Sequence, residues 1–171
     1  IQKPMNMAFD AKGRLWVTSS REYPFPAPLD QPARDSIKVL EDFDENGRAR
    51  KVTTFVDGVI AWSIPNIWFF QDTDGDGKAD KREVLFGPFG WERDTHGNQA
   101  SFRRGFDGWL YATHGYNNIS TVRGRDGSEI HMQSGNTYRV RLDGSRVEPH
   151  TWGQVNPFGL CFDPAGNIYS A

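Results

Sequence analysis

The feature that most constrains this chain is one short sequence pattern that occurs three times. The three copies occupy residues 9–17, 106–111 and 162–169. Each copy has apolar strand residues, a tight turn containing Asp and Gly, and a second strand in which apolar residues alternate. This is the sequence pattern of a β-hairpin. A hairpin that recurs in a sequence without helical periodicity indicates an all-β repeat fold, and a β-propeller is the expected architecture.

A second hairpin pattern accompanies the first, at residues 37–55, 67–86 and 137–148. Two consecutive hairpins give four strands, which is the content of one propeller blade. We therefore predict an all-β propeller of four-stranded antiparallel blades. Blade-like units are expected at residues 1–55, 56–95 and 96–153, and the start of the next at 154–171. Because a propeller closes with at least about four blades, these units would be part of a larger propeller.

The middle unit departs from the repeat. Residues 4–10 match residues 157–163 position by position and lead into the first hairpin of their units. No such lead-in precedes residues 57–61. Relative to a four-stranded blade, about one strand with its loop is therefore missing near residues 55–56. Two explanations stay open, a degenerate blade or a segment omitted at this junction, and the omission is preferred.

Composition excludes some classes of partner. The chain has 20 basic and 22 acidic residues, a net charge of -2, so no nucleic-acid partner is expected. No run approaches the roughly 18 consecutive apolar residues of a membrane-spanning helix. No membrane span is therefore expected in this segment, and no signal peptide is visible in it. The single Cys161 lies between Leu160 and Phe162, which predicts a buried thiol.

Residues 72–83 have the residue spacing of a calcium-binding loop of twelve residues. Lys78, at the seventh position, would contribute its main-chain carbonyl oxygen, and Glu83, at the twelfth, both carboxylate oxygens. Clustered carboxylates repel one another unless a cation is present. The alternative is an exposed acidic turn. The predicted calcium ligands are Asp72, Asp74, Asp76, Lys78, Asp80 and Glu83.

Polar and aromatic residues gather at both ends of the middle hairpin. His96 precedes its first strand, and Asn156 occupies the corresponding lead-in of the next unit. Because the blades of a propeller surround a central channel, equivalent positions of successive blades approach one another there. We therefore predict that His96 faces a polar cavity shared with Asn156, and a purely structural histidine is the alternative. The other members of the predicted site are Arg21, Tyr23, His114 and Tyr116.

Several segments resemble known dehydrogenases. Residues 96–115 resemble a stretch of the pyrroloquinoline-quinone (PQQ) glucose and sorbosone dehydrogenases, and residues 153–160 resemble their Gly-x-Arg-Asn-Pro-x-Gly-Leu segment. Residues 62–68, 90–97 and 134–138 resemble signature runs of a bacterial family of membrane-bound dehydrogenases, and this resemblance covers essentially the whole chain. Members of that family have propellers similar to sugar dehydrogenases, often followed by helical repeats and a Cys-x-x-Cys-His haem segment. No such segment occurs in residues 1–171.

The resemblance implies roles for two residues. His96 matches the general base that takes the proton of a sugar hydroxyl as hydride leaves for the quinone, a task that suits a neutral imidazole near neutral pH. Asn156 matches a polar residue next to the quinone. The resemblance also implies PQQ or haem c on the parent protein, and a periplasmic or extracellular location.

Two functions of different classes remain open. The first is a sugar or alcohol dehydrogenase domain of an exported redox protein, with transfer to a quinone or haem. The second is a non-catalytic, calcium-stabilised propeller that binds carbohydrate or a partner protein. Aromatic residues could then stack on sugar rings, and core packing is their alternative role. These residues are Trp91, Trp109, Tyr116 and Trp152, together with His114. The expected partners are a small carbohydrate or alcohol, the remaining blades of the propeller, and a haem domain.

Overall fold

The computed structural model of the chain describes residues 3–10, 12–21, 36–54, 58–74, 76 and 78–171. These residues form fifteen β-strands and no helix, so none of their segments is a helix that could span a membrane. The strand pairings whose register is described, in the sheets other than β5-β6-β7, are antiparallel. The all-β prediction is therefore confirmed. Residues 1–63 with 69–83 form one compact unit, and residues 64–68 with 84–171 form a second.

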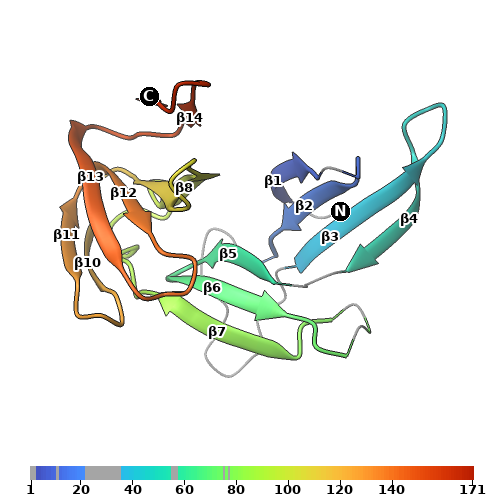
Figure 1. Ribbon diagram of the computed structural model, residues 1–171, viewed down its shortest axis with the longest axis horizontal. Helices are drawn as coiled ribbons and strands as arrows, with labels where there is room; N and C mark the ends of the chain where they lie inside the picture. The colour runs from blue at the N-terminus through green and yellow to red at the C-terminus, as the bar shows by residue number, and fades with distance from the viewer. Residues whose placement is uncertain (1–2, 11, 22–35, 55–57, 75, 77) are drawn as a thin grey trace. The chain divides into compact units, whose positions relative to one another are not determined.

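The first unit contains a four-stranded sheet in the order β1-β2-β3-β4 (Figure 1). Sequence-adjacent strands pair throughout, as predicted for two consecutive hairpins. Alternate residues of β2 and β3 point inward, with Val17, Ile37 and Val39 in the core. The strands are β1 (Pro4–Phe9), β2 (Leu15–Ser19), β3 (Ser36–Phe43) and β4 (Ala49–Thr54).

The next sheet has three strands, β5 (Val59–Ser63), β6 (Asn66–Gln71) and β7 (Lys81–Phe86), in that order. Three strands are one fewer than in a complete blade. The predicted junction at residues 55–56 lies outside the described residues, so the choice between a degenerate blade and an omitted segment stays open.

The second unit contains another four-stranded sheet, in the order β13-β12-β9-β8. Its strands are β8 (Gln99–Arg104), β9 (Leu110–His114), β12 (Gly135–Val140) and β13 (Val147–Gln154). These are the two hairpins predicted for this unit. Four-stranded antiparallel sheets thus occur in both units, while the radial arrangement of a propeller stays a prediction.

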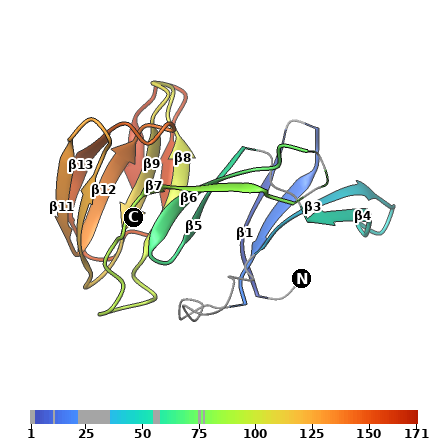
Figure 2. The same ribbon diagram turned by 90° about the horizontal axis from the view of Figure 1, so that it is seen from below.

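A hairpin that the sequence analysis missed is inserted between β9 and β12. It consists of β10 (Ile119–Arg123) and β11 (Glu129–Gln133), and its buried residues alternate with exposed ones. Figures 1 and 2 show this hairpin beside β12 and β13. Its tip is bound to the neighbouring turn, since the Asp126 N–H donates to the Ser145 carbonyl at 2.9 Å. The sequence signal was present, as a Gly-Arg-Asp-Gly turn at residues 124–127 between alternating segments.

The last hairpin pairs β14 (Leu160–Phe162) with β15 (Ile168–Ser170). Leu160 is buried against Trp109 and Tyr111 of the preceding sheet, and Phe162 packs on Tyr111 with ring centroids 5.1 Å apart. Cys161, between them, is exposed. The prediction of a buried thiol is therefore wrong, because successive side chains of a strand point to opposite faces and only one face of β14 packs on the sheet.

Five hairpin turns share one hydrogen-bonding pattern. In the first, the Asp10 N–H donates to the Arg14 carbonyl at 3.1 Å, and the Gly13 N–H donates to the Asp10 carbonyl at 2.9 Å. The same two bonds occur at residues 44–48, 105–109, 124–128 and 163–167. The fourth residue of each turn is a glycine with φ between 73° and 87°, as a type I turn followed by a left-handed residue requires.

This pattern corrects the alignment of the three repeats. Gly105, and not Asp107, occupies the turn position of Asp10 and Asp163. A Cβ at Gly105 would lie 2.6 Å from the Asp107 carboxylate and 2.7 Å from the Tyr111 ring. An aspartate at position 105 is therefore excluded, and Asp107 supplies the carboxylate from two residues further along the turn.

Asp107 connects the turn to the sheet behind it. Its Oδ2 atom accepts hydrogen bonds from the Tyr111 hydroxyl at 2.8 Å and from Arg139 Nη1 at 3.2 Å. Arg139 also donates to the Tyr111 hydroxyl oxygen and pairs with Glu148 at 2.6 Å. The Tyr111 hydroxyl thus joins a turn, a core aromatic ring and an ion pair.

We predict that Tyr111→Phe lowers the free energy of unfolding by about 0.5–1.5 kcal/mol, the net value of a typical hydrogen bond. Urea unfolding measures this loss as a lower midpoint at constant slope. Tyr169→Phe is the matched control, because its exposed hydroxyl donates to Asp163 at 3.2 Å in the last repeat. An equal or larger loss in the control would contradict the prediction.

Candidate ligand site at one end of the four-stranded sheet

Four strand ends of the second unit meet at one edge of its sheet. There β8 begins at Gln99, β9 ends at His114, β12 begins at Gly135 and β13 ends at Gln154. The Cα partners Gln99 and His114, His114 and Asn136, and Gly135 and Gln154 align these ends. The loops that precede or follow these strands carry three of the site residues predicted from the sequence, His96, Tyr116 and Asn156.

Two of these loops touch through their main chains. A Cβ on Gly97 would lie 2.5 Å from the Tyr116 carbonyl oxygen, and a Cβ on Gly115 would lie 2.6 Å from the carbonyl carbon of Gly97. Side chains at either position would force the main chains apart. The paired glycines therefore fix the loop of residues 94–97 against that of residues 115–118.

Asn118 closes this contact and was not among the predicted site residues. Its buried side-chain Oδ1 accepts the Asp94 N–H at 3.2 Å, and Nδ2 donates to the carbonyls of Asp94 at 2.6 Å and Gly97 at 3.1 Å. One amide thus binds the loop on both sides of His96. The only sequence signal was its place in the polar segment after His114.

His96 stands exposed on the loop that Asn118 holds. Its side chain is 77% exposed, and Nδ1 lies 3.6 Å from Oδ1 of Asp94. The same oxygen accepts the main-chain N–H groups of His96 at 2.7 Å and Gly97 at 3.2 Å. The His96 N–H bond is the main cause that lowers the pKa of Asp94. Asp94 therefore stays ionised beside the imidazole, and sequence analysis missed it.

Asn156 reaches the same pair of loops. Its Oδ1 accepts the Tyr116 N–H at 3.0 Å, which connects the segment after β13 to the loop after β9. No protein acceptor for Asn156 Nδ2 occurs among the described residues. Tyr116 is 48% exposed. Three predicted residues, His96, Tyr116 and Asn156, therefore lie on segments that are directly in contact.

His114 occupies a different environment. It is fully buried; Nδ1 lies 2.7 Å from the Ser134 carbonyl and Nε2 lies 2.8 Å from Ser120 Oγ. A carbonyl can only accept, so Nδ1 carries the proton and Nε2 accepts from the serine hydroxyl. Both ring nitrogens are thus used within the fold, and burial lowers the pKa of His114.

The remaining predicted residues are more dispersed. Arg21 is exposed two residues after the end of β2 in the first unit, and Tyr23 lies outside the described residues. Among the predicted aromatic residues, Trp109 is buried, with the guanidinium of Arg141 3.9 Å from its ring centroid. Trp152 is 78% exposed. Trp91 is partly exposed.

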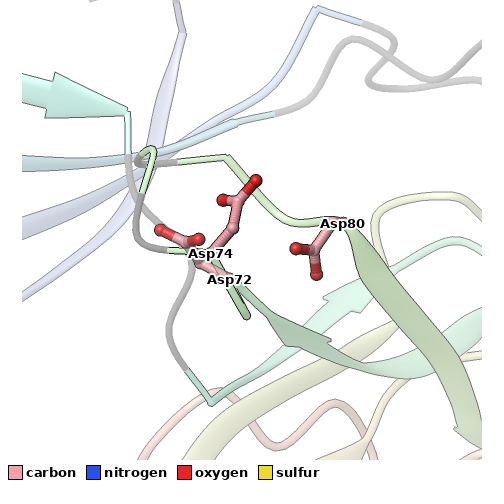
Figure 3. A group of neighbouring side chains, drawn as sticks. All are labelled: Asp72, Asp74 and Asp80. Atoms are coloured by element: carbon pink, nitrogen blue, oxygen red, sulfur yellow. The ribbon is translucent and has the colours of Figure 1, made fainter.

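The predicted calcium loop contains a smaller acidic group. Asp72 and Asp74 follow β6 and Asp80 precedes β7, and one carboxylate oxygen from each lies within 4.8 Å of the others (Figure 3). Asp80 accepts hydrogen bonds from the Thr73 hydroxyl at 2.6 Å and from its N–H. The Asp76 carboxylate lies outside this group, with Lys78 Nζ 3.5 Å from it. Glu83, on β7, is also outside the group.

These residues supply only part of a calcium coordination shell. Calcium takes about six to eight oxygen ligands, whereas the described group offers three carboxylates, one already bonded to Thr73. Exposed acidic groups of this kind are also common without a metal. Calcium binding by this loop stays a prediction.

Comparison with known proteins identifies a family without a known activity. The model of the Domain of unknown function (DUF7133) matches residues 1–171, the whole chain, which therefore belongs to that family. No curated protein and no solved structure gives a significant match.

We predict that acid destabilises this unit through His114. Its pKa in the folded state is below the ordinary value of about 6.5, so the unfolded chain binds the proton more readily. The free energy of unfolding is therefore highest above about pH 6.5 and falls as pH decreases toward the folded-state pKa. Burial and Arg139 lower the pKa of His150 too, which adds in the same direction.

Thermal unfolding between pH 7.5 and pH 5 measures this effect. The variant His114→Gln should be less stable at pH 7.5 but should have a smaller dependence on pH. His131→Gln, at an exposed position of β11, is the control and should keep the dependence of the unmodified protein. An unchanged dependence in His114→Gln would contradict the assignment.

We also predict that Asn118→Ala destabilises the loop pair by at least about 2 kcal/mol, because each buried main-chain group that loses its partner costs about 1–3 kcal/mol. Urea unfolding measures the loss. Asn117→Gly is the control, since Asn117 is exposed and has φ of 66°, a conformation that glycine adopts readily. Equal losses in the two variants would contradict a specific role for Asn118.

Proposed function

We propose that this member of the DUF7133 family binds a small carbohydrate or alcohol at the sheet end around His96, as a dehydrogenase-like propeller domain of an exported protein. The observation that carries the proposal is the exposed His96 imidazole on a loop that packs against the loop of residues 115–118, which in turn is hydrogen-bonded to Asn156. A rigid support is what a binding site needs, because ordering a mobile loop on binding costs free energy.

The chemistry of these side chains suits a hydroxylated ligand. An imidazole both donates and accepts hydrogen bonds, and the Asn156 amide has Nδ2 available as a donor. Tyr116 offers an aromatic face beside them, at 48% exposure. Sugars are generally bound by polar groups that hydrogen-bond to their hydroxyls. An aromatic ring beside these groups packs on the C–H groups of the sugar.

Asp94 favours a second, catalytic candidate at the same place. The Asp94 carboxylate lies 3.6 Å from Nδ1 of His96, on the side of the ring away from Nε2. This arrangement would assist His96 as a general base toward a ligand hydroxyl. Such a base is the role that the resemblance to sugar dehydrogenases implies for His96.

A quinone cofactor does not fit the residues around Asn156. The resembled segment has an arginine before this asparagine, where it faces the anionic quinone, whereas this chain has Val155, which is 70% exposed. An anionic group at this position would have no cation from that residue. We therefore derive no redox step here, and electron transfer to a haem of the parent protein belongs to the catalytic candidate alone.

Binding is tested with D-glucose as the probe, by chemical-shift titration of the 15N-labelled protein. We expect chemical-shift changes at residues 94–97, 115–118 and 156. We also expect His96→Ala to lower the affinity for glucose about tenfold, which corresponds to a loss of about 1.4 kcal/mol of binding free energy. His131→Ala, with an exposed histidine on the inserted hairpin, is the control and should bind glucose as the unmodified protein does. Absence of saturable binding, or equal losses in both variants, would contradict the proposal.

A further inference from the structure

His114 lies buried at the end of β9, directly before the loop that carries Tyr116. Its Nδ1–H donates to the Ser134 carbonyl at 2.7 Å, and its Nε2 accepts the Ser120 hydroxyl at 2.8 Å. We call His114, Ser120 and Ser134 the histidine node. Because the imidazole is 0% exposed, it does not touch a ligand, and its effect on the site passes through the segments that it holds.

Ser134 links the histidine node to the rest of the site. It is the single residue between β11 and β12, and its φ is 58°. A residue with a Cβ adopts this left-handed conformation at a cost, so the bonds around it hold it there. Its N–H donates to the Asn118 carbonyl at 3.0 Å, and its hydroxyl donates to the Val155 carbonyl at 3.4 Å.

The histidine node is thereby connected to all three segments of the proposed site. Asn118 binds the loop of residues 94–97 through its side-chain amide. Asn156, directly after the residue whose carbonyl Ser134 binds, accepts the Tyr116 N–H at 3.0 Å. The two loops and the segment after β13 therefore depend on the same few buried hydrogen bonds.

These bonds need a neutral imidazole. Protonation would make Nε2 a donor toward Ser120, whose Oγ already accepts the Gly90 N–H at 2.9 Å. The Ser120 hydroxyl hydrogen would then lose its acceptor, and a charge would be buried in the protein, at a cost in free energy. Burial is accordingly the main cause that lowers the pKa of His114.

The surroundings offer no compensation for this charge. Gln99 on β8 and Asn136 on β12 lie directly opposite His114 and are neutral, and burial raises the pKa of Tyr138, which keeps its proton. The Asp94 carboxylate accepts main-chain N–H groups of its own loop. None of these side chains contributes to the pKa shift of His114. The other charged or titratable residues on the adjoining loops, β10 and β11 are exposed: Glu92, Arg93, Tyr116, Arg123, Glu129 and His131.

We propose that His114 is a positioning residue whose charge state decides whether the site is assembled: the neutral imidazole holds the three segments together, and its protonation releases them. The site then binds its ligand at neutral pH and releases it in acid. This inference rests on the proposed function and adds its regulation by pH. Since the segments share one node, they open locally while the remainder of the sheet stays folded.

Hydrogen exchange of main-chain N–H groups tests this release without a ligand. The full chain is measured between pH 7.5 and pH 5, and each rate is divided by that of an unstructured peptide at the same pH. We expect protection of the Ser134 and Tyr116 N–H groups to fall by up to about tenfold per pH unit below about pH 6.5, because the open state binds the proton more readily. The N–H groups of Gly105 and Arg141, bonded to carbonyls at the other end of the sheet, should keep their protection.

His114→Gln removes the titration but keeps a donor and an acceptor in a neutral side chain, so protection of the Ser134 and Tyr116 N–H groups should no longer depend on pH. His96→Gln is the matched control, because it removes the exposed histidine of the same site and should retain the pH dependence. The ring 15N resonances of His114 give a second measurement in the unmodified protein. They should keep the values of the Nδ1–H tautomer until the two N–H groups lose protection.

D-glucose titration at pH 7.5 and pH 5 separates this inference from the proposed function. We expect about tenfold lower affinity at pH 5, the effect of an assembled site reduced to about one tenth of the population, and a smaller decrease in His114→Gln, where His96 still titrates. No glucose binding at either pH would overturn the proposed function, while hydrogen exchange would still decide whether His114 releases the segments. An unchanged pH dependence in His114→Gln, or equal loss of protection at Gly105 and Arg141, would overturn the inference.

Discussion

The fold depends on hydrogen bonds that fix its hairpin turns, and aspartate carboxylates reinforce these turns in all three repeats. Asp10 accepts main-chain N–H groups of its own turn and, through Oδ2, the indole N–H of Trp16. Asp163 does the same with the hydroxyl of Tyr169. These bonds hold the pKa of both carboxyls below the ordinary range, for Asp10 chiefly through Trp16 and for Asp163 chiefly through Asn167. Each turn is thereby tied to an aromatic residue of its second strand, and because turn geometry sets register, it also sets which side chains face the core.

The middle repeat reaches the same result with a different residue. Gly105 replaces the aspartate, and Asp107 binds Tyr111 from the other side of the turn. The buried ring of Tyr111 also packs against Phe162 of the next hairpin, so the same residue contributes to the stability of two successive repeats. The opposite end of this sheet is free of such turns. There the chain uses glycine contacts and the Asn118 amide to position loops, and this is where exposed functional groups gather.

The proposed site therefore combines a rigid support with an open surface. Main-chain contact at Gly97 and Gly115 removes freedom from the loops, while His96 and Tyr116 remain accessible. Buried polar atoms on the supporting face, such as the amide of Gln99, lack partners among the described residues. Such groups reduce stability, and proteins commonly retain this kind of cost near functional sites. Preorganised polar groups are therefore the basis of the proposed recognition of a polar ligand.

The sequence alone determined the all-β class, the paired hairpins and the glycine turns, because strand alternation and the Asp-Gly pattern are local properties of the chain. It also indicated that His96, Tyr116 and Asn156 belong near one another.

Only the tertiary structure decided the rest. It buried His114 and exposed Cys161, because burial depends on which face of a strand meets another sheet. It placed Asn118 against the loop of His96 through contacts between segments distant in sequence, which no local pattern encodes. It also separated Asp76 and Glu83 from the acidic group, since loop spacing fixes the order of carboxylates but not their convergence on one point.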